Sequence, residues 1–235
     1  MILILQFRTD KSGWHEVKCM YKATKLKYNE LCFLNANSNY FDKELFYKLT
    51  KKAKGIIIAG LGEGGFEKPN PRFNKMVNKI TPLIKDIIER DKPTLGICFG
   101  HQLIGKILGS EIKYDQKQAE TGIVDITLTK EGKEDKLFSN INTTFKAIEG
   151  HQSSVMSLPE NTVHLATSSK CNIQAFRYKN NVYGIQFHPE LDYEELQFRL
   201  NMYQDSNYIK HQVKSKYKKV DAIKVLENFV TKIAV

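Results

Sequence analysis

The sequence predicts an α/β protein built on an open, mostly parallel sheet that is flanked by helices and extended by an antiparallel strand section. Three observations support this fold class. Short apolar runs in the first half are typical of strands covered on both faces. Segments of helical periodicity separate these runs, and such alternation implies right-handed crossovers between parallel strands. In the second half, the strand-like runs alternate apolar with polar residues and are joined by short turns, which indicates antiparallel pairing.

The first half contains three expected strands and three expected helices. The strands are ILILQF at 2–7, GIIIAG at 55–60 and PTLGIC at 93–98. The helices are ELFYKLTKK at 44–52, NKMVNKITPLIKDIIERD at 74–91 and HQLIGKILG at 101–109. The last helix follows the third strand closely and ends at Gly109, a residue type that commonly terminates helices.

Four further strands are expected in the second half, and two helices near the C-terminus. The strands are at 122–129, 164–169, 173–178 and 182–187. A hairpin turn is expected at 179–181, where the sequence reads KNN. The helices are EELQFRLNMYQ and AIKVLENFVTKI, both within 191–235. Since no linker, repeat or low-complexity tract interrupts the chain, we expect a single domain over 1–235, with 200–235 as a C-terminal helical extension.

The composition is that of an ordinary globular domain. The chain has 235 residues, of which 41% are hydrophobic and 26% charged, and this is enough to bury a substantial core. The four cysteines form no C-x-x-C pair, which argues against a disulfide framework or a zinc site and suits a reducing compartment. The N-terminal apolar run is too short for a signal-peptide core or a membrane span. We therefore expect a soluble, cytoplasmic protein with no metal ion or other cofactor.

The net charge of +10 favours association with nucleic acid or another polyanion. However, the densest basic stretch, KHQVKSKYKK at 210–219, has no interleaved glycine–arginine pattern, and the chain contains no recognisable nucleic-acid-binding module. A lysine-rich, solvated surface explains the charge more simply. We therefore expect a small-molecule substrate, and neither nucleic acid nor a membrane as a partner.

The segment GICFG, residues 96–100, provides a candidate nucleophile. Gly-x-Cys-x-Gly between a buried strand and a helix is the cysteine version of the nucleophile elbow, a strained turn that lifts the side chain above the sheet. The N-terminus of the following helix favours a thiolate at Cys98, and the N–H of Phe99 would point toward a developing oxyanion. By itself the pattern is equally compatible with a buried structural cysteine beside two packing glycines.

The segment FHPE, at the end of the last expected strand, provides a base and a group to orient it. Pro189 favours extended backbone, in which residues two apart face the same way, so Glu190 can orient the imidazole of His188 while that imidazole takes the thiol proton. Sites in open parallel sheets form beyond the carboxyl ends of the strands, where both segments lie. Alone, His188 would be a surface histidine and Glu190 a charge at a helix N-terminus. Together with the elbow, they predict a Cys98–His188–Glu190 triad.

The other histidines are expected to have lesser roles. His101 should pack behind the elbow, and His151, in EGHQSSV, should lie in a loop that lines the site. The remaining three have no chemically suitable neighbours in the sequence and are expected to be structural or exposed. They are His15, His164 and His211.

The glycine-rich segment GLGEGG at 60–65 also follows an expected strand. It lacks the Gly-Lys-Ser/Thr ending of a P-loop and runs into FEKPNPRF instead of a helix, so nucleotide binding is weakly supported. A second source of backbone N–H groups for an oxyanion near Cys98 is the better interpretation.

Five segments of the chain, taken in order, resemble the class I glutamine amidotransferase family. They are GICFGHQLI, AETGIVDITLT, HQSSVMSLP, ATSSKCNIQAFRY and YGIQFHPE. The combination of Gly-x-Cys-x-Gly-x-Gln with a distant Phe-His-Pro-Glu is specific, and the likeness extends over residues 1–200. It is nearest to the stand-alone, GMP-synthase-like branch. The resemblance implies a flavodoxin-like fold.

The resemblance also implies a mechanism. Cys98 would attack the side-chain amide carbon of glutamine, and His188, oriented by Glu190, would pass a proton to the leaving ammonia. The resulting glutamyl thioester would then be hydrolysed. The N–H groups of Phe99 and Leu61 would stabilise the oxyanion. The implied substrate-contacting residues are Gln102, Gly60, Gly62, Gln152, Ser153 and Ser154.

One departure from the family pattern leaves the substrate open. The family usually has Gly-Gly-Pro where this chain has Gly-Leu-Gly at 60–62, and this changes the shape of the loop and access to the site. The first possible function is a glutaminase or amidotransferase that passes ammonia to a separate acceptor enzyme. The second is a γ-glutamyl peptidase with the same triad. The third, suggested by the basic C-terminal region, is a catalytically inactive binding or regulatory protein.

Overall fold

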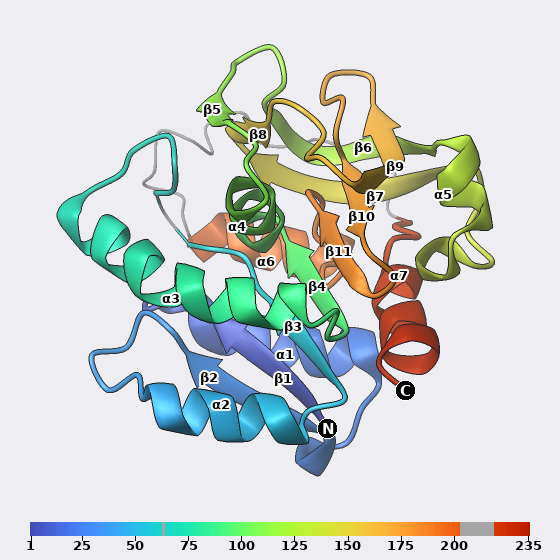
Figure 1. Cartoon of the computed structure of the whole chain (residues 1–235). Helices are drawn as coiled ribbons and strands as arrows, with labels where there is room; N and C mark the ends of the chain where they lie inside the picture. Colours follow the sequence, from blue (N-terminus) through green and yellow to red (C-terminus); the bar gives the residue numbers. More distant parts are fainter. Residues whose placement is uncertain (63, 203–218) are drawn as a thin grey trace.

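The computed structural model describes residues 1–62, 64–202 and 219–235, in which the largest feature is a mixed sheet of nine strands (Figure 1). The strand order across the sheet is β2-β1-β3-β4-β11-β10-β9-β6-β7. The first five strands are parallel to one another. From β11 to β7, each strand is antiparallel to its neighbour. The expected α/β fold, an open parallel sheet with an added antiparallel section, is confirmed.

The parallel section consists of short strands at the centre of the core. They are β1 (Ile2–Gln6), β2 (Leu31–Asn35), β3 (Gly55–Ile58), β4 (Thr94–Ile97) and β11 (Val182–Ile185). Successive residues of a strand point to opposite faces. In β1, Ile2 and Ile4 join the core on one face. Leu3 and Leu5 join the core on the other. Burial on both faces explains why such strands read as continuous apolar runs.

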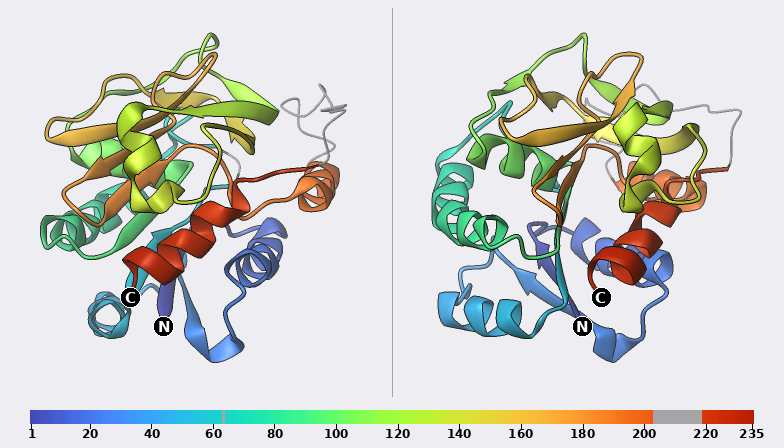
Figure 2. Two further views of the ribbon diagram at one scale, coloured as in Figure 1. Left: turned by 90° about the vertical axis from the view of Figure 1, so that its right-hand side faces the viewer. Right: turned by 45° about the vertical axis from the view of Figure 1, so that its right-hand side comes forward.

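Helices cover both faces of the parallel section (Figures 1 and 2). On one face, packed against Leu3 and Leu5, lie α2 (Lys43–Lys52), α3 (Pro71–Glu89) and α4 (Phe99–Ile107). On the other face, packed against Ile2 and Ile4, lie α1 (Ser12–Thr24) and α7 (Ile223–Asn228). The expected helices at 44–52, 74–91 and 101–109 are confirmed, although α4 begins two residues early because it starts directly after the turn at Cys98.

The antiparallel section extends the sheet beyond β11. Its strands are β6 (Glu120–Leu128), β7 (Thr144–His151), β9 (Thr162–Ser168) and β10 (Ala175–Tyr178). The expected hairpin turn at 179–181 joins β10 to β11, and Lys179 adopts a φ of 53° there. A separate two-stranded sheet pairs β5 (Ile112–Tyr114) with β8 (Ser153–Val155). Short helical turns are α5 (Lys130–Glu134), η1 (Tyr28–Glu30) and η2 (Lys136–Phe138).

Hydrophobic periodicity missed β2, β5, β7, β8 and α1. The reason is clearest for α1, because its buried face carries polar side chains as well as apolar ones. His15 and Glu16 are fully buried beside Cys19 and Met20. A helix whose inward face mixes charges with apolar groups gives no clean apolar stripe.

The C-terminal residues fold back onto the core. The two expected helices are present as α6 (Tyr193–Met202) and α7, which continues as the π-helical turn η3 (Phe229–Ile233). Val225, Leu226 and Phe229 are fully buried on the same face as α1. The basic stretch 210–219 lies, except for its last residue, outside the described residues. Among the helices of the described residues, none is both long and apolar enough to cross a membrane.

Candidate active site

Cys98 occupies a sharp turn between β4 and α4. Its φ of 51° and ψ of −100° lie outside the helical and extended regions that side-chain-bearing residues prefer. Backbone strain of this kind persists where the surrounding structure enforces it, and it is concentrated at functional sites. Since α4 begins at the next residue, the positive end of the helix dipole lies at Cys98. The side chain is almost fully buried and lines a cavity.

The two glycines that flank Cys98 allow α4 to cross the sheet at close range. A Cβ on Gly100 would lie 2.1 Å from the carbonyl oxygen of Ile58 in β3. A Cβ on Gly96 would lie 2.5 Å from the backbone of Gly100. Both clashes are with backbone, which cannot rotate away. The glycines are therefore required by the packing of α4 on β3 and β4, and this packing holds the strained turn in place.

His188 and Glu190 follow β11 and face Cys98 across the end of the sheet. β11 is parallel to β4 with Ile185 paired to Ile97, so the residues beyond both strands emerge at the same edge. The Nδ1 atom of His188 lies 2.8 Å from Oε1 of Glu190, and His188 also interacts with the Cys98 side chain. The structure thus brings together the three residues that the sequence singled out.

Arg199, on α6, adds a fourth charged group to this cluster. Its Nη1 donates a hydrogen bond to Oε1 of Glu190 at 3.1 Å. Its Nε donates to Nδ1 of His15 at 3.3 Å, and the Nε2 of that histidine lies 2.7 Å from Glu195. A buried chain of polar contacts therefore runs from α1 and α6 to the group that orients His188.

Charge neighbours set the protonation states of the pair. Burial by itself would lower the pKa of His188, but its interactions with Glu190 and Cys98 raise that pKa to about 10. Burial by itself would raise the pKa of Glu190, and the positive charges of His188 and Arg199 overcome it and hold that pKa well below its ordinary value. At neutral pH the pair is an imidazolium and a carboxylate.

The raised pKa of His188 gives a measurable prediction. In the wild-type protein, the imidazole should keep its proton up to a pH of about 10, and Cys98→Ala or Glu190→Gln should lower the pKa of His188 because each removes an interaction that raises it. The folded-state pKa of His188 lies above the ordinary histidine pKa of 6.5. Protonation of His188 therefore contributes its full stabilisation of the fold below pH 6.5, and this stabilisation is lost as the pH rises to about 10. NMR titration of ¹⁵N-labelled imidazole, assigned with His188→Gln, measures this. A wild-type pKa of 6.5 or lower would contradict it.

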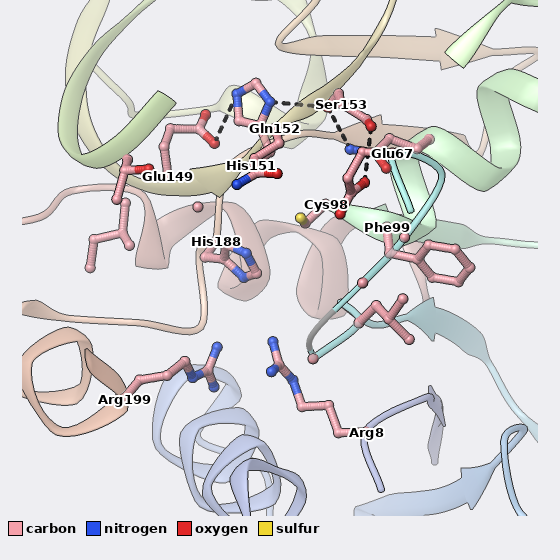
Figure 3. A pocket seen from close by; sticks show the side chains of 18 of the residues that line it. Arg8, Glu67, Cys98, Phe99, Glu149, His151, Gln152, Ser153, His188 and Arg199 are labelled. Carbon is pink, nitrogen blue, oxygen red and sulfur yellow. Dashed lines mark hydrogen bonds and ion pairs between the residues drawn. The ribbon is translucent and has the colours of Figure 1, made fainter. Parts of the chain in front are cut away.

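A cavity of about 460 Å³ opens beside the predicted triad (Figure 3). This volume is within the usual range for small-molecule sites. Its wall includes Cys98 and His188 but not Glu190, which lies behind the imidazole. The wall also includes six of the other sequence-predicted residues: Leu61, Gly62, Phe99, Gln102, Gln152 and Ser153.

Two predicted substrate-contacting residues do not line the cavity. Gly60 packs behind His188, where a Cβ would lie 3.1 Å from Cε1 of the imidazole. Ser154 is fully buried, and its hydroxyl lies 3.4 Å from Nδ1 of His151 and accepts a contact from the Cys171 thiol. Both residues therefore lie one layer behind the cavity wall. The missing side chain of Gly60 lets the imidazole of His188 pack closely against the backbone there.

Hydrogen bonds tie three segments of the wall together. The Nε2 of Gln102 donates to the carbonyl oxygen of Ser153 at 2.7 Å and to Oε1 of Gln186 at 3.2 Å. The hydroxyl of Ser153 donates to Oε2 of Glu67 at 3.0 Å. These bonds fix α4, β8 and the segment that follows the glycine-rich loop relative to one another. The amide of Gln102 is thus engaged with the protein itself.

Sequence reasoning missed five charged residues of the cavity wall. They are Arg8, Glu67, Lys68, Glu149 and Arg199. Two of them carried a signal that could have been used. Arg8 follows an apolar strand at its carboxyl end, where sites form. Arg199 is a charge on the inward face of a helix, since it is buried together with Leu196.

The remaining histidines occupy the expected kinds of position where they are described. His101 is fully buried behind the elbow against Phe176, and burial lowers its pKa to about 3. His151 lines the cavity, although on β7 and not on a loop. His15 is buried, His164 is half-buried, and His211 lies outside the described residues.

Two buried groups in the described residues have donor atoms close enough to hold a metal ion. One is His15, Cys19 and Glu195, and the other is Glu120, His151 and Cys171. In the first group, Glu195 is also paired with Lys18 and Lys22, whose positive charges disfavour a cation there. In the second group, His151 lines the cavity, and Glu120 and Cys171 lie behind it.

Comparisons with known proteins agree with this geometry. The family profile described as glutamine amidotransferase class-I matches residues 21–200. A subunit of the glutamine-hydrolyzing GMP synthase of Methanosphaera stadtmanae is 40% identical over 142 residues, which are 60% of this chain and 67% of that protein. Gamma-glutamyl peptidase 4 of Arabidopsis thaliana is 32% identical over 142 residues, which are 60% of this chain and 55% of that protein. The chain thus spans about two thirds of the length of the first relative and about half of the second.

The fold is also shared with a solved structure. A glutamine amidotransferase from Thermotoga maritima superimposes with a TM-score of 0.76 at 18% identity, over 99% of this chain and 97% of that one. At this identity the likeness supports the fold alone. The family profile covers most of the chain, from the end of α1 into α6. The chain therefore belongs to the class I glutamine amidotransferase family.

Proposed function

We propose that the protein is a cysteine-dependent hydrolase of γ-glutamyl amides, and that glutamine is its simplest substrate. The observation that carries this proposal is the strained Cys98 beside the His188–Glu190 pair, on the wall of a cavity. A positioned thiol, a histidine and a carboxylate that orients the histidine make up the constellation that nucleophilic catalysis needs.

The proposed reaction has two halves. His188 takes the proton of the Cys98 thiol, and the sulfur attacks the γ-carbonyl carbon. The N–H groups of Phe99 and Leu61 stabilise the oxyanion. His188 gives its proton to the nitrogen as the C–N bond breaks, so that ammonia leaves and a γ-glutamyl thioester remains. His188 then takes a proton from water, whose oxygen attacks the thioester carbon. The C–S bond breaks and glutamate is released.

The fate of the ammonia is a second part of the proposal. Relatives such as the one from Methanosphaera stadtmanae are named as one subunit of a GMP synthase. This naming supports the proposal that ammonia released here is used by a separate acceptor enzyme in the cytoplasm. Activity on glutamine by the isolated chain would then be raised when the acceptor is added.

A γ-glutamyl peptidase is the second candidate function. The chemistry at the γ-carbon is the same, and the leaving group is an amino acid or peptide in place of ammonia. Two arginines, Arg8 and Arg199, lie on the cavity wall next to His188, which is the group that must protonate the leaving amine. The likeness to a γ-glutamyl peptidase also favours this candidate.

Measurement of glutamate release tests the proposal. The wild-type chain should release glutamate from glutamine or from γ-glutamyl peptides, and a glutamine-like chloroketone should label Cys98 unless substrate is present. Cys32→Ser is the matched control, because Cys32 is a half-buried cysteine outside the cavity and its loss should leave the rate unchanged. If no γ-glutamyl amide is hydrolysed and Cys98 resists labelling, the inactive binding protein becomes the correct description.

A further inference from the structure

The cavity wall carries a buried carboxyl group that has no hydrogen-bond partner among the described residues. Glu149, on β7, is 1% exposed, and neither of its carboxylate oxygens has a hydrogen-bond partner among the described residues. Its ion pair with Nε2 of His151 spans 3.7 Å, which is too long for a hydrogen bond. Glu149 is close enough to Cys98 and His188 to interact with the charges of both. Burial and the neighbouring Glu120 carboxylate raise the pKa of Glu149 well above its usual range. A cationic group on a ligand would relieve this cost, so the buried carboxyl group points to such a ligand.

A guanidinium group with an open donor lies at another part of the same wall. Arg199 is 7% exposed, and its Nη2 has no hydrogen-bond partner among the described residues, although its Nη1 and Nε are engaged. Guanidinium groups pair preferentially with carboxylates. An open, buried donor of this type points to an anionic group on a ligand.

Arg8 strengthens the cationic side. Its Nε donates to Glu16 at 2.9 Å and its Nη1 to Ser12 at 3.0 Å, so two contacts with α1 fix the position of the side chain. A Cβ on Gly60 would lie 3.4 Å from Nη2 of Arg8 and 3.1 Å from Cε1 of His188, which makes the guanidinium and the imidazole neighbours. In Figure 3 both guanidinium groups point toward His188 from one side, and Glu149 lies on the other.

The position of His188 decides which part of a substrate meets the arginines. The imidazolium must protonate the leaving nitrogen, so the leaving group lies against His188. A substituent on that nitrogen continues toward the guanidinium groups beside the imidazole. The glutamyl part then lies on the side of His188 away from the arginines, where Figure 3 shows Glu149.

We propose that the site is built for γ-glutamyl amino acids, with the α-ammonium of the glutamyl group paired to Glu149 and the carboxylate of the leaving amino acid paired to Arg199 and Arg8. This proposal rests on the Cys98 chemistry proposed above. Glutamine carries its ammonium and carboxylate on one carbon and releases ammonia, so it cannot engage both sides at once. A γ-glutamyl amino acid has an ammonium on one side of the scissile amide and a carboxylate on the other.

Three substrates test the two ends separately in the wild-type protein. The leaving amine of γ-glutamyl-ethylamide is that of γ-glutamyl-alanine without the carboxylate, and glutaryl-alanine is γ-glutamyl-alanine without the ammonium. Each single deletion should lower kcat/KM by about 10- to 100-fold, the effect of one buried charge-assisted hydrogen bond. Glutamine should likewise be a poorer substrate than γ-glutamyl-alanine.

Variants then assign each preference to a side chain. Arg199→Gln should lower the ratio of kcat/KM for γ-glutamyl-alanine over γ-glutamyl-ethylamide toward one, with Arg8 retaining part of the preference, and should leave the ratio over glutaryl-alanine intact. Glu149→Gln should do the reverse. Arg199 also holds Glu190, so all rates fall with Arg199→Gln, but a loss of positioning affects both substrates of a ratio equally. Arg90→Gln, which removes an exposed ion pair outside the cavity, is the matched control.

The outcomes separate this proposal from the proposed function. The two-ended site is wrong if the wild-type protein hydrolyses γ-glutamyl-alanine and its two analogues with similar kcat/KM, or if it hydrolyses glutamine faster than γ-glutamyl-alanine. Either result leaves the proposed Cys98 chemistry intact. Wild-type preferences that persist in both Arg199→Gln and Glu149→Gln overturn the assignment to these side chains. If none of the four compounds is hydrolysed, the proposed function is wrong, and the two-ended site is wrong with it.

Discussion

Replacement of Cys98 by alanine should lower kcat/KM for the best γ-glutamyl amide by at least about 10⁴-fold, because no nucleophile remains for thioester formation. The cavity wall, with Gln102 and Ser153, is left in place, so substrate binding should be largely retained. Steady-state kinetics should therefore show the loss in kcat, and isothermal titration should show that the variant still binds substrate.

A double variant checks that the thiol and the imidazole act as a unit. His188→Ala alone should also be severe, and Cys98→Ala combined with His188→Ala should be little worse than Cys98→Ala, since residues of one catalytic set are strongly non-additive. Cys32→Ser should match the wild-type rate. Residual activity of Cys98→Ala within tenfold of wild type, about 1.4 kcal/mol in transition-state stabilisation, would remove Cys98 from the mechanism.

The second large effect is expected on stability, from Gly100→Ala. The new Cβ would lie 2.1 Å from the carbonyl oxygen of Ile58 and 2.9 Å from its carbonyl carbon, so α4 would have to move away from β3. Overpacking against backbone in a close-packed core costs about 3 kcal/mol or more. The shift would also displace the turn at Cys98, so activity should fall as well. Urea unfolding followed by circular dichroism measures the loss of stability.

Gly150→Ala is the matched control for this substitution. A Cβ on Gly150 meets nothing within 4 Å, and its φ is not positive. The free energy of unfolding should change by no more than about 0.5 kcal/mol. If Gly100→Ala and Gly150→Ala unfold at the same urea concentration, the proposed tight crossing of α4 over β3 is wrong.

The sequence was a good guide wherever a local pattern had one physical meaning. Continuous apolar runs predicted the strands β1, β3 and β4, because a strand buried on both faces needs apolar residues at every position. The alternation of strands and helices predicted parallel pairing. The Gly-x-Cys-x-Gly turn predicted an elbow at Cys98, and His188-Pro189-Glu190 predicted that His188 and Glu190 would share a side.

Local patterns failed where burial involves charges. Neither α1 nor the inward face of α6 shows a clean apolar stripe, because His15, Glu195 and Arg199 are buried as a hydrogen-bonded chain. Such residues are expected at the surface unless they are paired, and their partners lie more than a hundred residues away in the sequence.

By itself the sequence determined the fold class and the residues of the candidate triad, because an elbow, an extended His-x-Glu and the alternation of strands and helices depend on local conformation. Only the tertiary structure decided what surrounds the triad. The pairing of β4 with β11 brings Cys98 and His188 to one edge, and the packing of α6 and β7 sets Arg199 and Glu149 on the same cavity wall. Contacts between elements depend on how the whole chain packs, and no spacing along the sequence records them.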